Sequence, residues 1–140
     1  METIDSFTGQ YRFLSNFWSA PTTVIGIEYM SSEAAYQACK TTDLSVREQF
    51  TKLGPGDAKK LGQKIELRPD WTLVTKIECM ELCLRAKFMR NPLLLDKLVA
   101  TGLAQLIEGN TWGDTFWGVC RGKGTNYLGK LLMEIRKENQ

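Results

Sequence analysis

Histidine is absent from this 140-residue sequence. Acid–base chemistry near neutral pH must therefore fall to carboxylates or to a lysine with a lowered pKa, since imidazole is the usual group that titrates there. The four cysteines contain no CxxC pair of the type that binds zinc, and no histidine is present to complete such a site. We therefore predict reduced, mostly buried thiols, no metal ion and no cofactor.

Long apolar runs are also missing. No stretch approaches the roughly 20 apolar residues that a membrane span needs, and the opening METIDSF lacks the charged and then apolar pattern of a signal peptide. The formal net charge is only +2, which is too small to indicate a nucleic-acid binder by itself. We expect an intracellular, cytoplasmic protein that does not associate with a membrane.

The composition is that of one folded domain. Hydrophobic residues make up 43% and charged residues 24% of the chain, and 140 residues are enough to bury a core. No repeat or linker divides the sequence, so we predict a single domain over residues 1–140. Its class is α+β and helix-rich, with one small β-sheet formed by a hairpin within 21–30 and by strands near 104–108 and 116–120.

Capping residues and apolar periodicity place the helices. The residues expected at helix starts are Ser31 or Ser32, Asp43, Asp57, Asp70, Pro92 and Asn126. The longest helix is predicted after Asp70, with Trp71 in its first turn. Its apolar stripe consists of Leu73, Ile77, Met80, Leu84 and Phe88. Arg85 and Lys87 flank that stripe, and we expect both at its rim, in salt bridges rather than in a ligand site.

The stretch 29–40, YMSSEAAYQACK, is the most informative part of the chain. On a helix that starts at Ser32, Glu33, Gln37 and Lys40 fall in one narrow sector, with Tyr36 at its edge. The intervening alanines allow another element to approach closely. An acid, an amide and an amine on one face predict a site, although a solvated helix face has the same pattern.

Residues 109–129 form a second unusual stretch, with six of the chain's twelve glycines and two of its four tryptophans. Such glycine density lets a backbone approach a ligand or make turns, and tryptophans offer flat surfaces for a ring. GKGTN, residues 122–126, precedes a predicted helix start and would suit a phosphate. It does not match the GxxxxGK[ST] phosphate loop, so this indication is weak taken alone.

Several short motifs, in this order, resemble those of the NADAR family, the YbiA-like N-glycosidases. They are FLSNFW (13–18), SSEAAYQACK (31–40), RPDW (68–71) with CLRAKF (83–88), and the closing block DTFWGVCRGKGTNYLGKLLMEIR (114–136). The resemblance spans nearly the whole chain. It implies an enzyme that cleaves a ribose from an exocyclic amine, either in ribosylamino-pyrimidine phosphates of riboflavin synthesis or in ADP-ribosylated guanine.

The resemblance also implies which residues act. Glu33, Trp71 and Asp114 correspond to the catalytic residues of the family, and Lys40 matches a lysine two helical turns after the glutamate. The residues expected to line the substrate site are Asn16, Phe17, Tyr36, Gln37, Trp117, Gly118 and Asn126, of which Tyr36 and Gln37 follow from helix geometry.

Two carboxylates suit this chemistry. Breaking a ribosyl C–N bond develops positive charge at the anomeric carbon, which a carboxylate stabilises, while the leaving amine needs a proton. We assign the proton or the attacking water to Glu33 and the sugar to Asp114, although the roles could be reversed. Lys40 is a candidate for a Schiff base with the opened ribose. Trp71 and Trp117 would stack on the base or the sugar, and residues 118–126 would meet phosphate.

The preferred substrate is ADP-ribosylated guanine, including guanine in ADP-ribosylated DNA, and riboflavin intermediates come second. A non-catalytic module that binds ADP-ribose or a nucleotide is the alternative from another class. The glycosidase prediction requires Glu33 and Asp114 to converge on one cavity, with an amine beside them. Nothing in the sequence indicates an oligomeric state.

Overall fold

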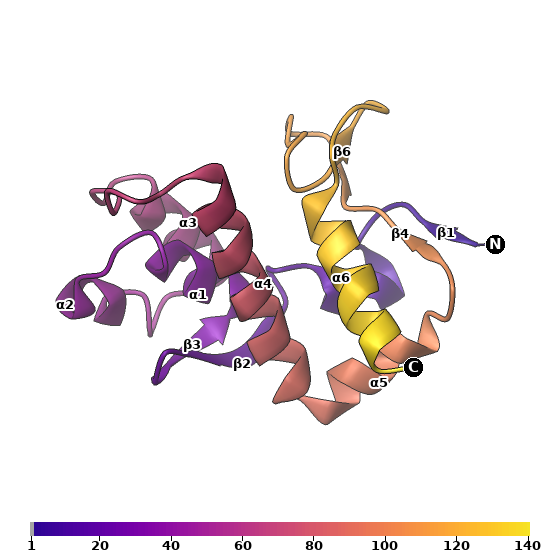
Figure 1. The fold of residues 1–140 in the computed structure, drawn as a ribbon, viewed down its shortest axis with the longest axis horizontal. Coiled ribbons are helices and arrows are strands. Elements are labelled where there is room, and N and C mark those ends of the chain that lie inside the picture. Colours follow the sequence, from indigo (N-terminus) through magenta and orange to yellow (C-terminus); the bar gives the residue numbers. More distant parts are fainter. Residues whose placement is uncertain (1) are drawn as a thin grey trace. The chain divides into compact units, whose positions relative to one another are not determined.

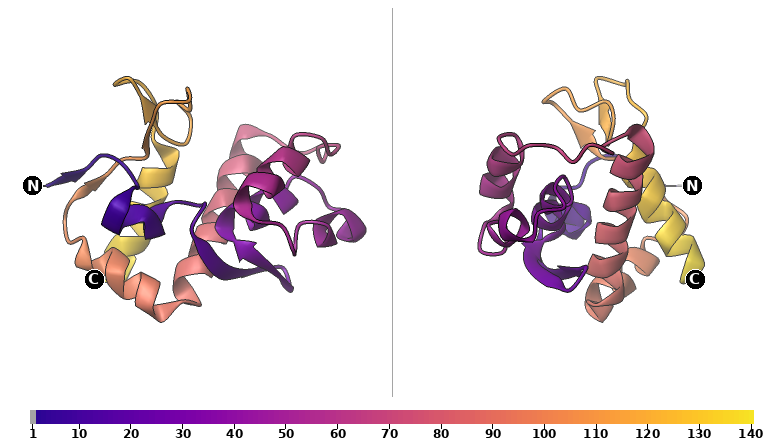
Figure 2. Two further views of the ribbon diagram at one scale, coloured as in Figure 1. Left: turned by 180° about the vertical axis from the view of Figure 1, so that it is seen from behind. Right: turned by 60° about the vertical axis from the view of Figure 1, so that its left-hand side comes forward.

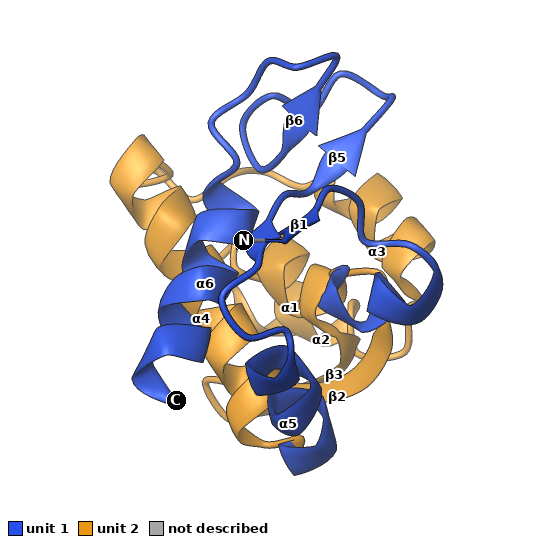
Figure 3. Ribbon diagram, turned by 90° about the vertical axis from the view of Figure 1, so that its right-hand side faces the viewer, with its two compact units in different colours: residues 1–15, 92–140 blue, residues 16–91 orange. Residues whose placement is uncertain are grey.

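The computed structural model describes residues 2–140, and Figure 1 shows the order of its helices and strands. The chain forms two compact units, drawn in two colours in Figure 3. One contains residues 16–91 and the other contains the residues up to 15 together with 92–140. The predicted α+β, helix-rich class is confirmed, and the single domain over 1–140 stays a prediction.

The hairpin of the 16–91 unit is formed as predicted. β2 (Ser19–Val24) pairs with the antiparallel β3 (Ile27–Ser31), with Val24 opposite Ile27. The two residues of the turn, Ile25 and Gly26, have φ angles of 49° and 76°. Two consecutive positive φ angles match the right-handed twist of the strands, and glycine adopts this conformation without a steric penalty.

Four helices follow in this unit: α1 (Ser32–Ala38), α2 (Leu44–Glu48), α3 (Pro55–Gly62) and α4 (Leu73–Met89). The caps predicted for the first two are confirmed, because Ser31 accepts a hydrogen bond from the amide of Ala34 and Asp43 accepts from Ser45 and Val46. The other two starts were wrong. The cap of α3 is Gly54, followed by proline at the first helical position, and the cap of α4 is Thr72.

α4 carries the core of this unit and packs against β2 and α1 (Figure 2). Met80, Leu84 and Phe88 of the predicted stripe are buried, whereas Leu73 at the helix start is exposed. Arg85 forms the expected ion pair with Glu81, with a distance of 2.9 Å between Nε and Oε2. Lys87 contradicts the rim prediction: its side chain is fully buried, and this burial lowers its pKa to about 7.

The other unit combines two helices with short strands. α5 (Pro92–Ala100) begins at the predicted proline, and α6 (Tyr127–Glu138) packs against it and against β4 (Gln105–Leu106). β4 pairs in parallel with β1 (Thr3–Ile4), and β5 (Gly109–Asn110) pairs in parallel with β6 (Val119–Cys120). A 3₁₀ helix, η1 (Gly9–Leu14), completes this unit.

The prediction of one small sheet was wrong. Within residues 2–140 the strands form three separate two-stranded sheets, β1 with β4, β2 with β3 and β5 with β6. The strand expected near 104–108 is only two residues long, Gln105–Leu106, and pairs with the two residues of β1. Among the described residues, all four cysteines are free and buried, and no helix is both long and apolar enough to cross a bilayer.

Candidate active site

Glu33 lies in the first turn of α1 with 8% of its surface exposed. Asn16 fixes this end of the helix: its carbonyl oxygen accepts from the Glu33 amide at 3.2 Å, and its Oδ1 accepts from the Ser32 hydroxyl at 2.8 Å. The Asn16 Nδ2 donates to the sulfur of Met80 at 3.3 Å. Asn16, predicted to bind substrate, therefore has both ends of its amide engaged in positioning the helix that carries Glu33.

Gln37 lies one turn after Glu33, and its Nε2 donates to Glu33 Oε2 at 2.6 Å. Lys40 does not share their helix as predicted, because α1 ends at Ala38 and Lys40 lies in the turn that follows. The Lys40 ammonium nitrogen nevertheless lies near α1, 5.9 Å from the centre of the Tyr36 ring. The Tyr36 ring in turn meets Trp71, with 5.9 Å between ring centres.

The charges around Lys40 oppose one another. Burial is the main cause that lowers the pKa of the Lys40 ammonium group, Glu33 raises it, and the nearby Lys76 and Lys59 lower it further. Burial, followed by the Glu33 charge, raises the pKa of Tyr36. Glu33 therefore interacts electrostatically with both Tyr36 and Lys40, and the net effect of the surroundings is a Lys40 pKa below the ordinary lysine value.

Arg68 is a positioning residue that the sequence reasoning missed. Its amide donates to the Lys40 carbonyl at 2.8 Å and its guanidinium reaches the Cys39 carbonyl at 3.4 Å, so it caps the end of α1. Asp70, predicted as a helix cap, instead accepts two hydrogen bonds from Arg68, at 2.6 and 2.9 Å. These hydrogen bonds with Arg68 lower the pKa of Asp70. They also fix the RPDW segment that brings Trp71 to Tyr36.

Asp114 belongs to the other unit and organises the loop in which it lies. Its Oδ1 accepts from the amides of Phe116 and Trp117 at 3.1 and 2.9 Å, an Asx-type turn. Asn110, which sequence reasoning also missed, accepts from the Asp114 amide at 3.0 Å and donates to the Asp114 carbonyl at 2.9 Å. One carboxylate oxygen and the backbone of Asp114 are thus held in place.

The remaining predicted residues of this loop support its backbone. Trp117 is half-buried, and its ring meets the Phe116 ring edge-on with centres 4.6 Å apart. A Cβ atom at Gly118 would collide with Glu108, so only glycine allows this approach. Asn126 does not cap α6 with its side chain; its Nδ2 donates to the Leu106 carbonyl at 2.9 Å and its Oδ1 accepts from the Glu108 amide at 3.0 Å.

The geometry does not favour phosphate binding at the start of α6. The amides of Asn126, Tyr127 and Leu128 donate to the carbonyl oxygens of Gly118, Phe116 and Trp117, at 3.3, 3.2 and 3.0 Å. These are the N–H groups that a helix start would otherwise offer to an anion. Within the described chain the loop uses them itself, so the GKGTN segment closes the loop and offers no open helix start to a ligand.

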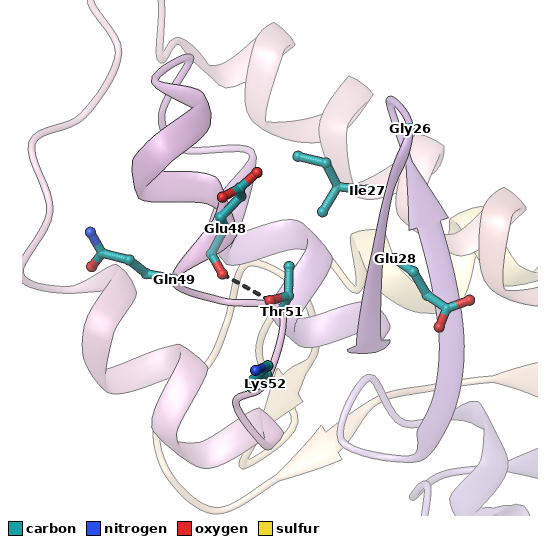
Figure 4. A pocket seen from close by; sticks show the side chains of 7 residues that line it. All are labelled: Gly26, Ile27, Glu28, Glu48, Gln49, Thr51 and Lys52. Atoms are coloured by element: carbon teal, nitrogen blue, oxygen red, sulfur yellow. Dashed lines mark hydrogen bonds between the residues drawn. The ribbon is translucent and has the colours of Figure 1, made fainter.

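Two surface hollows of the 16–91 unit are lined by residues other than the predicted site residues. One, of about 650 Å³, lies between the tip of the β2–β3 hairpin and the segment after α2 (Figure 4). Its lining residues are Gly26, Ile27, Glu28, Glu48, Gln49, Thr51 and Lys52. The other, of about 410 Å³, lies between residues 41–49 and 65–69. Neither is lined by a predicted site residue. Glu33 and Asp114 belong to different units, so their convergence on one cavity stays a prediction, and Phe17 is exposed at the start of its unit.

A buried carboxylate, a partly buried amine and an aromatic pair lie together around Tyr36, and these are the kinds of group that acid–base catalysis uses. Residues 5–139 match the model of the NADAR domain. The N-glycosidase YbiA of Escherichia coli (strain K12) is 38% identical over 137 residues, which make up 95% of this chain and 84% of that protein. The chain therefore belongs to the NADAR domain family.

Two further comparisons agree with this assignment. The NMR structure of the E. coli protein YbiA matches the fold with a TM-score of 0.85 at 35% identity, over 99% of this chain and 86% of that chain. The riboflavin biosynthesis protein VVA0006 of Vibrio vulnificus (strain YJ016) is 36% identical over 134 residues, which make up 93% of this chain and 36% of that protein.

Proposed function

We propose that this chain, a hydrolase acting on N-glycosyl bonds, cleaves the bond between ribose C1 and an exocyclic amine and removes ADP-ribose from ADP-ribosylated guanine. The observation that carries the proposal is the arrangement around Glu33. Its carboxylate is buried, accepts a short hydrogen bond from Gln37 and interacts electrostatically with the amine of Lys40. A desolvated acid beside an amine and two aromatic rings suits the cleavage of a glycosidic C–N bond.

The reaction can be written with these groups. The bond from C1 to nitrogen breaks with its electron pair on nitrogen, and the nitrogen takes up a proton to leave as a free amine. Water supplies the oxygen that bonds to C1, and its proton goes to a carboxylate. We assign the proton transfers to Glu33. Asp114 stabilises the positive charge that develops on the sugar. Trp71 and Trp117 stack on the base or the sugar.

The proposed substrate suggests a partner, and the cysteines suggest a location. If the guanine belongs to DNA, its exocyclic amine lies in the minor groove, so we expect single-stranded substrate or an extruded base. Four free, buried cysteines are compatible with a reducing, cytoplasmic setting, which we include in the proposal.

A second candidate substrate has support from the relatives. VVA0006 carries a name from riboflavin synthesis. So does the riboflavin biosynthesis protein PYRR of Arabidopsis thaliana, which is 43% identical over 95 residues. Ribosylamino-pyrimidine phosphates contain the same ribose C1 to exocyclic amine bond. A phosphate on such a substrate would have to be bound elsewhere than at the start of α6, whose first amides are already engaged.

Incubation with both substrate classes distinguishes these functions. We expect the wild-type protein to release unmodified guanine or guanosine nucleotide and ADP-ribose from ADP-ribosylated guanine, detected by mass spectrometry. Release of amine from the pyrimidine phosphate alone would replace the first substrate by the second. Binding of ADP-ribose without release from either substrate would contradict the enzymatic proposal and favour a non-catalytic module.

Trapping with borohydride tests the proposed role of Lys40. When the ribose ring opens, C1 becomes an aldehyde. A neutral amine adds to this carbon, water leaves, and borohydride reduces the resulting imine to a stable secondary amine. Because burial lowers the pKa of Lys40, its neutral fraction increases with pH and does so below the ordinary lysine range. Trapped ribose adduct should therefore increase with pH from neutral to mildly alkaline conditions.

Lys40→Arg is the control for this experiment, because arginine keeps a positive charge near Glu33 but forms no imine. We expect the adduct to vanish in this variant and its peptide to be identified at Lys40 in the wild type. An adduct of unchanged yield in Lys40→Arg would assign the imine to another lysine, and full activity of that variant without any wild-type adduct would rule out the imine route.

A further inference from the structure

The side chain of Gln37 is buried, with 5% of the residue exposed, yet only one half of its amide is used. Its Nε2 donates to Glu33 Oε2 at 2.6 Å, a length typical of a hydrogen bond to an ionised group. Its Oε1 is buried and has no hydrogen-bond partner within the described residues. An unsatisfied buried acceptor lowers stability, so such a group calls for an explanation.

The space beside that amide comes from α3, which packs against α1. Gly62, the last residue of α3, faces the Gln37 side chain. A Cβ atom at this position would collide with Gln37 Oε1 and would lie 2.7 Å from Gln37 Cδ. Any residue other than glycine at position 62 therefore displaces the amide. The backbone of Gly62 is ordinary helix, so an alanine there is not strained by its φ angle, although it would also lie 3.2 Å from Gln37 Cβ and would need a small shift there besides the movement of the amide.

We propose that Gln37 is a positioning residue for Glu33 rather than a substrate ligand. The absence of a side chain at Gly62 leaves the space that the Gln37 amide occupies in this orientation. The Oε1 atom packs against the backbone of α3, and this orientation directs Nε2 at the carboxylate. One donor then fixes both the position and the ionised form of Glu33. The catalytic meaning of this pair depends on the proposed function, whereas the pairing itself does not.

Other titratable groups lie near Glu33 and would also affect the pH dependence of the activity. From its own segment, Tyr36 and Lys40 interact with it electrostatically. From the helices packed against α1, Lys59 of α3 and Lys76 of α4 act on Lys40. None of these groups is altered by a substitution at Gly62, which makes that position the cleaner test.

The test compares Gly62→Ala with Gly56→Ala on the same helix, where an added Cβ meets nothing within 4 Å. Gly62→Ala retains every proposed catalytic residue. We expect its kcat to fall by about 10- to 100-fold, with KM changed by less than about threefold, because the acid is misplaced and the substrate contacts are kept. Gly56→Ala should match the wild type. Gln37→Met should reproduce the Gly62→Ala defect, and the double variant should be no worse than either single variant.

A carbon-13 NMR titration of the Glu33 side-chain carboxyl supplies a readout besides activity. Loss of the Gln37 donor should move the titration midpoint to higher pH in both Gly62→Ala and Gln37→Met. Unchanged midpoints in both variants would overturn the inference. If the wild type cleaves neither substrate while the midpoints move as expected, the proposed function fails and the positioning role stands. If the wild type is active and Gln37→Met raises KM alone, Gln37 is a substrate ligand and the inference is wrong.

Discussion

Glu33→Gln is expected to bind the ribosylated substrate and to release amine about 1,000-fold more slowly than the wild type. The substitution keeps the size and hydrogen-bonding reach of the side chain but can neither take up nor donate the reacting proton. The introduced glutamine can present its own amide oxygen to the Nε2 of Gln37, so this hydrogen bond should be kept without any movement of Gln37. Single-turnover measurement of free amine, together with substrate binding by calorimetry, separates the two steps.

Glu28→Gln is the matched control, since Glu28 is an exposed glutamate on β3 of the same unit. It removes one negative charge without touching the proposed site, and its rate should equal that of the wild type. Retention of more than about a tenth of the wild-type rate by Glu33→Gln would remove Glu33 from the proton transfers.

Features of the fold that depend on a few neighbouring residues could be predicted from the sequence. Ser31 caps α1 because its hydroxyl needs only the amide three residues later, and Gly26 makes the hairpin turn because of its own backbone freedom. The periodic apolar stripe likewise predicted α4, since burial of Met80, Leu84 and Phe88 follows from their spacing. Such features are local, so the order of helices and the α+β class followed from them.

Features that depend on a competition between possible partners, or on residues distant in the chain, could not be predicted in this way. Asp70 is a residue type that often caps helices, but both of its carboxylate oxygens accept hydrogen bonds from Arg68, and Thr72 caps α4 instead. A stripe of equally spaced polar residues cannot show that α1 ends before Lys40. The strands form three separate two-stranded sheets. Which strands pair depends on the path of the loops between them, and apolar periodicity does not encode that path.

The candidate site illustrates the same limit. Motif resemblance indicated Glu33, Lys40, Trp71 and Asp114, and the geometry places the first three around Tyr36. Arg68 and Asn110, the residues that brace these segments through backbone hydrogen bonds, carried no signal that periodicity could detect. The local cues that could have drawn attention to them are an arginine two residues before an aspartate and an asparagine four residues before an aspartate.

Asp114→Asn separates the loop-holding role that the hydrogen bonds of Asp114 show from the catalytic role that we propose for it. Asparagine retains an oxygen that can accept from the amides of Phe116 and Trp117, so the loop should stay folded. The negative charge is lost, and with it the stabilisation of the developing positive charge on the sugar, so we expect kcat to fall by about 100- to 1,000-fold. Thermal unfolding and kcat, measured on the same preparation, report the two roles independently.

Asp114→Ala should lose the turn as well as the charge, and should lower stability by about 1 kcal/mol more than Asp114→Asn. Asp43 offers the matched control, because its Oδ1 accepts from the amides of Ser45 and Val46 in the same type of turn. Asp43→Ala should lower stability and leave kcat unchanged. If Asp114 and Glu33 act on one transition state, the double variant Glu33→Gln with Asp114→Asn should lose less than the product of the single losses. Wild-type kcat in Asp114→Asn would instead restrict Asp114 to holding its loop, and the positive charge on the sugar would then have to be stabilised by Glu33 alone.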